Sequence, residues 1–245
     1  MNNIKLEVCC GSAEDVFSAA KAGADRVELN SALYLGGLTP SPGTVRLAKK
    51  AGIPIMVMIR PREGGFCYSG PEIDTMLEDI FLFRAEGIEG FVFGVLNPDG
   101  TLDRERNAIL VKACGDREKV FHRAIDVVPD WKAALDTLIE LGFDRVLTSG
   151  QAANAIAGAE TIGEMVKYAN GRIDILPGGG IRPGNAAELL SKTGCTQLHS
   201  SCSSLLTDDS CSSNPNISFR GSNGEDMYPS CDEDKIHKLL SAIGR

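Results

Sequence analysis

Short apolar runs rich in β-branched residues alternate along the chain with longer segments whose apolar residues recur at helical spacing. This alternation is typical of β-α units that build a parallel sheet. The runs that predict strands are all short, and there are eight of them: 4–9, 25–30, 54–60, 90–95, 119–123, 144–149, 174–178 and 197–201.

Helix ends are marked by the residues that such ends prefer. Ser12 can cap a first helix, and Gly87, Gly142 and Gly194 each stand between a helical segment and a strand. The recurrence favours one repeating architecture, so we predict a single TIM-type (β/α)8 barrel domain over residues 1–245. The alternative is an open doubly wound sheet, but no Gly-x-Gly-x-x-Gly pattern follows the first strand.

Residues 203–231 interrupt the rhythm, because they are rich in Ser, Asn, Asp and Gly and include Pro215 and Pro229. We predict a long irregular loop after the eighth strand, followed by a last helix over 232–243. Leaving from the carboxyl end of a strand, the loop could cover the barrel mouth or reach a neighbouring subunit. A partly disordered surface loop is the alternative.

Composition excludes several classes of partner. The formal net charge of -8 leaves no basic surplus for nucleic acid or for an anionic membrane surface. No apolar run approaches the roughly 18 residues of a membrane helix, and the polar start is unlike an export signal, so we expect a cytoplasmic protein. The eight cysteines are scattered without CxxC spacing, which indicates reduced thiols rather than a disulfide framework.

Polar residues at the ends of the predicted strands are the candidates for chemistry, since barrels carry their sites at that rim. Glu7, Glu28, Arg60 and His122 are candidate catalytic groups, and His199 is a candidate base or metal ligand. We expect Arg60 to satisfy the carboxylates of Glu7 and Glu28. A buried Glu-Arg network that only fills the barrel end is the structural alternative.

A second set of residues at the same rim suggests an anion site. Three glycines after the seventh strand would let the backbone approach an anion, although glycines also serve simply to make a tight turn. Cations around the rim, Arg182 among them, favour a negative ligand. The predicted anion-binding residues are Arg62, Arg123, Gly178, Gly179, Gly180, Ser200 and Ser201.

Several strings along the chain, taken together, resemble the CutC family. They include Leu6-Glu7-Val8-Cys9, Gly23-Ala24-Asp25-Arg26-Val27-Glu28-Leu29, Gly36-Gly37-Leu38-Thr39-Pro40-Ser41, Ile59-Arg60-Pro61-Arg62, Phe121-His122-Arg123-Ala124 and His199-Ser200-Ser201. The resemblance covers almost the whole chain in order. It implies a TIM barrel, a cytoplasmic homo-oligomer (dimer or tetramer) and a role in copper homeostasis, but no settled reaction.

The family's proposed copper(I) site uses cysteines at the ends of the first two strands. Cys9 matches the first, whereas Asn30 stands where many relatives have the second. Cys10, Cys67 and His199, together with Met58, are the candidates to complete a different site. The first hypothesis is therefore a copper homeostasis protein that binds copper(I) at the barrel mouth. The alternative is an uncharacterised barrel enzyme acting on a small anionic or phosphorylated metabolite, and a pure interaction scaffold ranks below both.

Overall fold

The computed structural model describes residues 4–211, 213, 214, 216 and 227–245. Its central feature is a ring of parallel strands, and each of the eight predicted strands is confirmed; the first is shifted by one residue and the other seven are slightly shorter than predicted. The strands are β1 (Lys5–Cys10), β2 (Arg26–Leu29), β3 (Ile55–Met58), β4 (Gly90–Phe93), β5 (Glu118–Phe121), β6 (Arg145–Thr148), β7 (Asp174–Pro177) and β8 (Gln197–Ser200).

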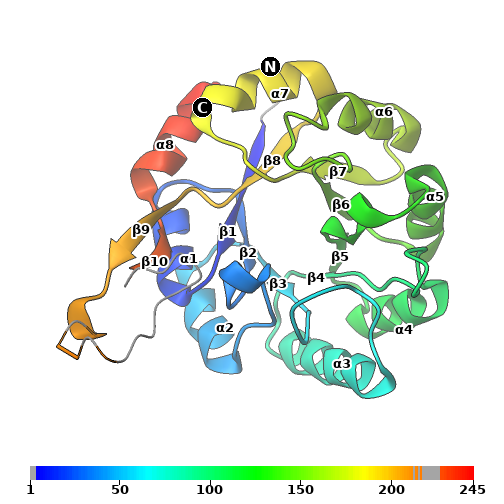
Figure 1. Ribbon diagram of the computed structural model, residues 1–245, viewed down its shortest axis with the longest axis horizontal. Coiled ribbons are helices and arrows are strands. Elements are labelled where there is room, and N and C mark those ends of the chain that lie inside the picture. Colours follow the sequence, from blue (N-terminus) through cyan, green and yellow to red (C-terminus); the bar gives the residue numbers. More distant parts are fainter. Residues whose placement is uncertain (1–3, 212, 215, 217–226) are drawn as a thin grey trace.

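The strands form a nearly closed (β/α)8 barrel, as predicted (Figure 1). Each strand pairs in parallel with its neighbour in the chain, and β8 returns to pair with β1. Between β7 and β8 a single bridge, Gly178 to His199, completes the ring. Gly178 therefore closes the barrel directly beside His199. The carboxyl ends of the strands meet at one rim, which is where a functional site is expected.

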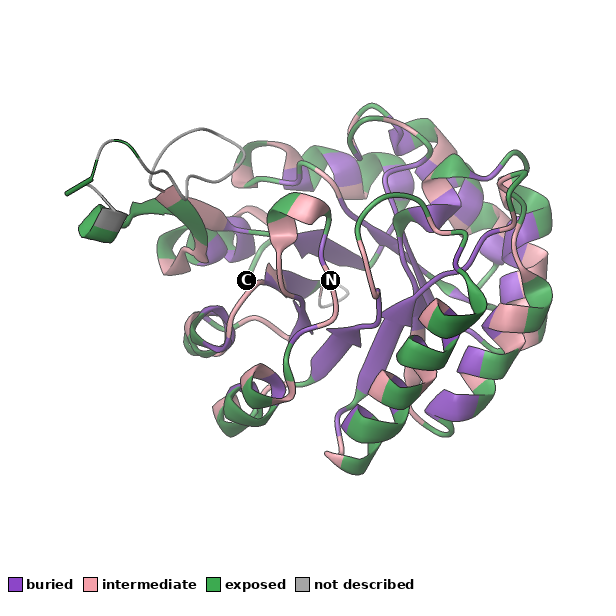
Figure 2. Cartoon of the chain, turned by 60° about the horizontal axis from the view of Figure 1, so that its bottom comes forward, coloured by how far each residue is buried: buried purple, intermediate pink, exposed green. Residues whose placement is uncertain are grey.

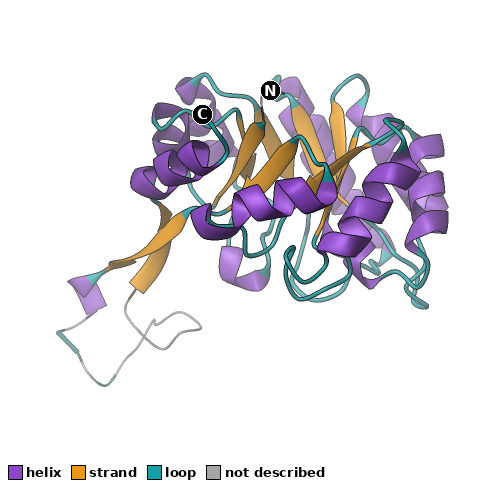
Figure 3. Cartoon of the chain, turned by 90° about the horizontal axis from the view of Figure 1, so that it is seen from above, coloured by secondary structure: helices purple, strands orange, loops and turns teal. Residues whose placement is uncertain are grey.

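Helices cover the outside of the barrel (Figure 3). They are α1 (Ala13–Lys21), α2 (Pro42–Ala48), α3 (Gly70–Ala85), α4 (Arg104–Cys114), α5 (Trp131–Leu141), α6 (Ala159–Ala169), α7 (Pro183–Thr193) and α8 (Glu233–Ala242). The capping rules hold where they were applied: the Ser12 hydroxyl accepts the Asp15 N–H at the start of α1, and Gly142 and Gly194 end α5 and α7 in the left-handed conformation. The predicted last helix is α8.

The barrel interior is divided into an apolar and a polar half. Between the sheet and the helices lies a continuous apolar core, so the strands are buried (Figure 2). Inside the barrel, Met56, Met58, Val92 and Val120 form a separate apolar cluster on β3, β4 and β5. Buried polar residues gather on β1, β2, β6 and β8: Glu7, Arg26, Glu28, Arg145, Gln197 and His199. Charged groups with so little exposure need partners, and these determine the site.

Residues 203–231 are more regular than the sequence predicted. Its described residues include an antiparallel pair of strands, β9 (Ser203–Thr207) and β10 (Met227–Cys231), and a short 3-10 turn over Asp209–Cys211. The pair extends outward from the barrel beside α1 and α8 (Figure 1). Its base is fixed by Asp15, whose Oδ1 accepts the backbone N–H of Cys231 at 2.7 Å. Residues 212, 215 and 217–226, which also belong to the predicted loop, lie outside the described residues.

Gly158, just before α6, stands where the backbone passes very close to another segment. A Cβ at this position would lie 2.0 Å from the carbonyl oxygen of Ser149. We expect Gly158→Ala to lower the free energy of unfolding by about 1–3 kcal/mol, because backbone must move to admit the methyl group. Urea unfolding measures the loss.

Gly184→Ala is the matched control for this substitution. Gly184 lies in α7 and a Cβ there would meet nothing within 4 Å. Alanine should be neutral or stabilising at this helical position. Equal unfolding curves for the two variants would contradict the close contact between Gly158 and the Ser149 carbonyl oxygen.

Candidate functional site

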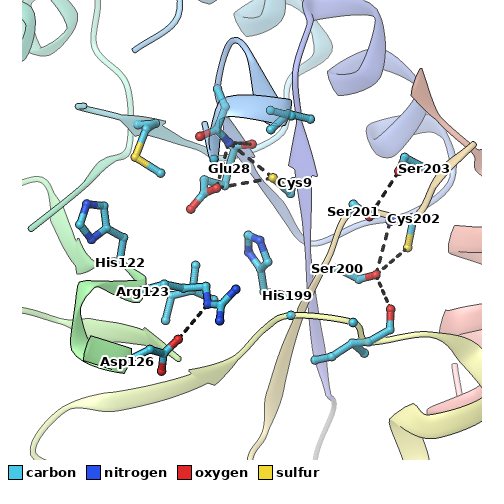
Figure 4. Close-up of a pocket in the computed structure, with 18 of the residues that line it drawn as sticks. Cys9, Glu28, His122, Arg123, Asp126, His199, Ser200, Ser201, Cys202 and Ser203 are labelled. Carbon is cyan, nitrogen blue, oxygen red and sulfur yellow. Dashed lines mark hydrogen bonds and ion pairs between the residues drawn. The ribbon is translucent and has the colours of Figure 1, made fainter. Parts of the chain in front are cut away.

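Cys9, Glu28 and His199 gather at the barrel mouth from three adjacent strands. The parallel register sets Cys9 of β1 opposite Glu28 of β2, and Glu7 of β1 opposite His199 of β8. Since side chains alternate along a strand, Glu7 and Cys9 point to the same, inner side. One ligand-type atom from each of Cys9, Glu28 and His199 lies within 4.8 Å of the others (Figure 4). We call these three residues the ligand cluster.

Asn30 orients the donor atoms of the ligand cluster. Its Nδ2 donates to Glu28 Oε2 at 2.9 Å and to Cys9 Sγ at 3.5 Å. The Cys9 thiol lies 3.6 Å from the same Glu28 oxygen. The second carboxylate oxygen, Glu28 Oε1, is buried and has no hydrogen-bond partner among the described residues. A carboxylate oxygen left in this state is open to a cation or to a donor group of a ligand.

Glu7 lies beneath the cluster and holds His199 in place. Its Oε1 lies 2.8 Å from His199 Nδ1, while Arg26 Nε donates to Oε2 and Arg145 Nη1 approaches within 3.8 Å. Because Glu7 engages Nδ1, the other ring nitrogen of His199 is left for a ligand. A carboxylate behind a histidine in this way is the usual support of a metal-binding imidazole.

The expected pairing of Arg60 with Glu7 and Glu28 is wrong. Arg26, one strand away and in register with Glu7, takes that place, and its Nη2 also donates to Gln197 Oε1 at 2.5 Å. Arg60 lies just past the end of β3, where its guanidinium turns to the loops. Neither Arg26 nor Arg145 was singled out from the sequence. The signal for Arg26 was present, since it stands two residues before Glu28 on the same face of one strand.

The charges of the ligand cluster are set by burial and by these partners. Burial raises the pKa of Cys9 well above its usual range, and the Glu28 carboxylate adds to this effect. Burial also raises the pKa of Glu28. Glu7 differs, because the charge of Arg26 and the hydrogen bond from His199 outweigh its burial and hold its pKa well below the usual range. The Cys9 thiol therefore keeps its proton until a cation displaces it.

Arg60, Phe66 and His122 form what we call the far wall of the same pocket. The Arg60 guanidinium lies over the Phe66 ring, 5.5 Å from its centroid, and the His122 ring lies 4.6 Å from Phe66 between centroids. Arg60 donates to the carbonyl oxygens of Leu35 (2.9 Å), Gly37 (3.0 Å) and Gly64 (2.7 Å). It forms no ion pair with a carboxylate among the described residues.

The predicted anion-binding residues are divided between the pocket and its surroundings. Arg123, Gly179, Gly180, Ser200 and Ser201 line the pocket, as does Arg182. Arg123 pairs with Asp126 at 2.8 Å and donates to Ser149 Oγ at 2.7 Å. Ser200 donates its hydroxyl to the Ile181 carbonyl.

Four of the residues predicted to bind an anion or a metal do not line this pocket: Gly178, Cys10, Cys67 and Arg62. The Cys10 side chain belongs to the apolar core on the other side of β1, where its thiol faces the Val8 carbonyl. Cys67 is exposed and does not line the pocket. Arg62 pairs with Glu72 and donates to the carbonyls of residues 63, 65 and 67. In this arrangement Cys10 and Cys67 do not join Cys9 around one ion.

The fold and the site define a class: a (β/α)8 barrel with a polar cluster at the carboxyl ends of its strands. The particular family follows from comparison with known proteins. The model of the CutC family matches residues 4–204, and the chain belongs to this family. The part of the chain that the structure describes contains no helix long and apolar enough to cross a membrane.

Relatives match over most of their own length. A CutC family protein of Treponema denticola is 52% identical over 99% of this chain and 100% of the relative. The human copper homeostasis protein cutC homolog is 45% identical, with 85% of this chain and 76% of the relative covered. Among solved structures, the crystal structure of CutC from Streptococcus agalactiae superposes with a TM-score of 0.78 at 36% identity, covering 81% of this chain and 98% of that chain.

Proposed function

We propose that this protein takes part in copper homeostasis by binding one copper ion in the ligand cluster of Cys9, Glu28 and His199. The observation that carries the proposal is the convergence of a thiol, a carboxylate and an imidazole within 4.8 Å at the barrel mouth. The human relative is named for copper homeostasis, which agrees with this chemistry. The comparisons support the copper role over the alternative of an enzyme for anionic metabolites.

The donor set fits copper. Thiolate and thioether are the soft ligands that select copper(I), and imidazole is also a ligand that copper accepts. Met58, a thioether, lines the same pocket and adds a soft donor on the neighbouring strand. We assign copper(I) to Cys9 and His199, with Glu28 beside them. Asn30 hydrogen-bonds the thiol and the carboxylate from the position where the resemblance places a second cysteine.

Removal of the Cys9 sulfur should weaken copper binding strongly. We expect the wild-type protein to bind one equivalent of copper(I) under anaerobic reducing conditions, and Cys9→Ser to bind it at least about 10- to 100-fold more weakly, because even the loss of a residue that only supports a metal ligand costs that much. Titration against a competing chelator measures both affinities, and a parallel titration with zinc tests the preference for copper.

Cys67→Ser is the control, because Cys67 is an exposed thiol outside the pocket. Its copper affinity should equal that of the wild type. An unchanged affinity in Cys9→Ser would remove the ligand cluster from copper binding, and tighter binding of zinc would contradict the choice of metal.

We also propose that the protein is a cytoplasmic homo-oligomer, a dimer or a tetramer. The reducing compartment is supported by the cysteines whose side chains the structure describes, since none of them is in a disulfide. Sedimentation velocity tests the oligomeric state.

A further inference from the structure

The pocket at the barrel mouth is much larger than a metal ion needs. Its volume is about 840 Å³, whereas one water molecule takes roughly 30 Å³. Volumes of this size are typical of sites for organic ligands. In Figure 4 Cys9 and Glu28 lie close together, whereas His122 and Arg123 lie apart from them, and His199 lies between Cys9 and Arg123. The ligand cluster therefore leaves the far wall free to contact a second ligand.

His122 on the far wall presents a hydrogen-bond donor to the pocket. Its ring is only 4% exposed, and Nδ1 accepts the backbone N–H of Ala124 at 3.3 Å. The proton of the neutral ring must then be on Nε2. This buried Nε2 has no hydrogen-bond partner among the described residues, and His122 lines the pocket. A buried donor without a partner is rare enough to require an explanation.

Arg60 places a positive charge beside this donor. Arg60 is 6% exposed, and three carbonyl oxygens accept hydrogen bonds from its guanidinium but leave its charge without a counter-ion among the described residues. Arg60 Nε has no hydrogen-bond partner among the described residues. A buried cation normally has an anionic partner, so the balance of charge on this wall is incomplete.

The approach to the far wall also suits an anion. Gly179 and Gly180 line the pocket with positive φ angles of 98° and 74°, and a Cβ on Gly179 would come 3.5 Å from Arg123 Nη1. Glycine therefore lets a ligand reach the backbone at this position. Arg123 adds a second, partly exposed cation at the entrance, with Asp126 beside it.

We propose that the far wall is a second binding site, which accepts the oxyanion of a small organic molecule, a carboxylate or a phosphate. One oxygen accepts the His122 Nε2 proton, and Arg60 supplies the compensating charge. The site goes beyond copper binding and does not depend on it, since none of its groups belongs to the ligand cluster.

Calorimetric titration of chelator-treated protein with inorganic phosphate and with malonate, at fixed ionic strength, tests this site. We expect saturable binding of one equivalent of at least one of the two. Phosphate alone would identify a phosphorylated ligand, malonate alone a carboxylate ligand, and both an oxyanion site of broad specificity. Binding of neither to the folded wild-type protein would overturn the proposal.

Two substitutions of His122 distinguish the role of its Nε2 donor from that of the hydrogen bond at Nδ1. Asparagine in His122→Asn can still accept the Ala124 N–H but lacks the distal donor, so binding should weaken about tenfold or more, as expected for a hydrogen bond to a charged group. Glutamine in His122→Gln restores a donor near the Nε2 position, and binding should stay within about threefold of the wild type. Equal affinities of His122→Asn and wild type would overturn the proposal.

Cys9→Ser separates this site from the copper site. It should bind the anion as the wild type does, whatever its copper affinity, and loss of anion binding in it would place the anion at the ligand cluster instead. If His122→Asn does not fold, a measurement on the wild-type protein still tests the anion site. The His122 ring N–H resonance, assigned through His122→Gln, should move downfield when the anion binds, and no movement at saturation would overturn the proposal.

Discussion

Arg26→Met is expected to lower the free energy of unfolding by about 3–5 kcal/mol, the usual cost of removing one member of a buried ion pair. The reason is that Glu7 would remain in the barrel interior without its nearest cation. Arg145, at 3.8 Å, is its remaining guanidinium partner among the described residues, and it already donates to Glu118 at 3.0 Å. Equilibrium unfolding in urea, followed by circular dichroism, measures the loss.

A surface pair provides the control for this prediction. Arg46 pairs with Glu86 on the outside of the barrel, and Arg46→Met should leave the unfolding free energy nearly unchanged because exposed pairs contribute little. The double variant Glu7→Gln with Arg26→Met should recover part of the stability, since no unpaired carboxylate is left. If Arg26→Met unfolds at the same urea concentration as Arg46→Met, the buried network is not what holds the barrel mouth.

Most of the barrel could be predicted from the sequence because each strand is marked locally. Eight apolar runs, with Gly142 and Gly194 ending the helices before two of them, are sufficient to define the order of strands. Local pattern does not say which side chains meet across strands. Glu7 was assigned to Arg60 on the basis of chemistry alone, yet the parallel register places Arg26 opposite Glu7. Arg60 lies two residues past the end of β3, where its guanidinium binds loop carbonyls instead of the carboxylates.

The composition of the segment after β8 did not predict its strands. Its Ser, Asn and Gly content predicted an irregular loop, but β9 and β10 pair at its two ends. Leu205, Leu206 and Tyr228 are exposed on this hairpin, so no alternation of buried and exposed positions marks the strands. Pro229 also argued against a strand, although proline is tolerated at an edge and both strands of a two-stranded pair are edges.

The sequence predicted which kinds of residue lie at the candidate site, but only partly which residues contact one another. Of the five residues expected at the barrel mouth, Glu28, Arg60, His122 and His199 line the pocket, whereas Glu7 lies beneath it and contacts His199. Sequence could not show that Cys10 points to the helices while Cys9 points inward, because a shift of one residue reverses every side chain of a strand. The sequence also could not show that Glu28 Oε1 and His122 Nε2 lack a hydrogen-bond partner among the described residues. This depends on the packing of the whole barrel around them.

Stability should fall as the pH is lowered from 6.5 to 5, and His122 should account for about 2 kcal/mol of that loss. Burial lowers the pKa of His122 to about 3, and the charge of Arg60 contributes, although Asp126 opposes it. The native ring therefore stays neutral in this range while the unfolded chain takes up a proton below its ordinary value of 6.5. The contribution of His122 to the free energy of unfolding is therefore complete above pH 6.5 and is lost as the pH falls toward 3.

His122→Gln removes this titration and leaves the other groups in place. The pKa of His199 is raised by the Glu28 and Glu7 carboxylates against its burial, and because His199 is present in both proteins its contribution to the slope cancels in the comparison. Glu28, whose pKa burial raises, acts in the opposite direction but equally in both proteins. Urea unfolding at pH 5 and pH 6.5 should therefore give a smaller loss for His122→Gln than for the wild type, by about 2 kcal/mol. Equal losses would mean that His122 is hydrated or charged in the native barrel, and the donor on the far wall would then have water as its partner.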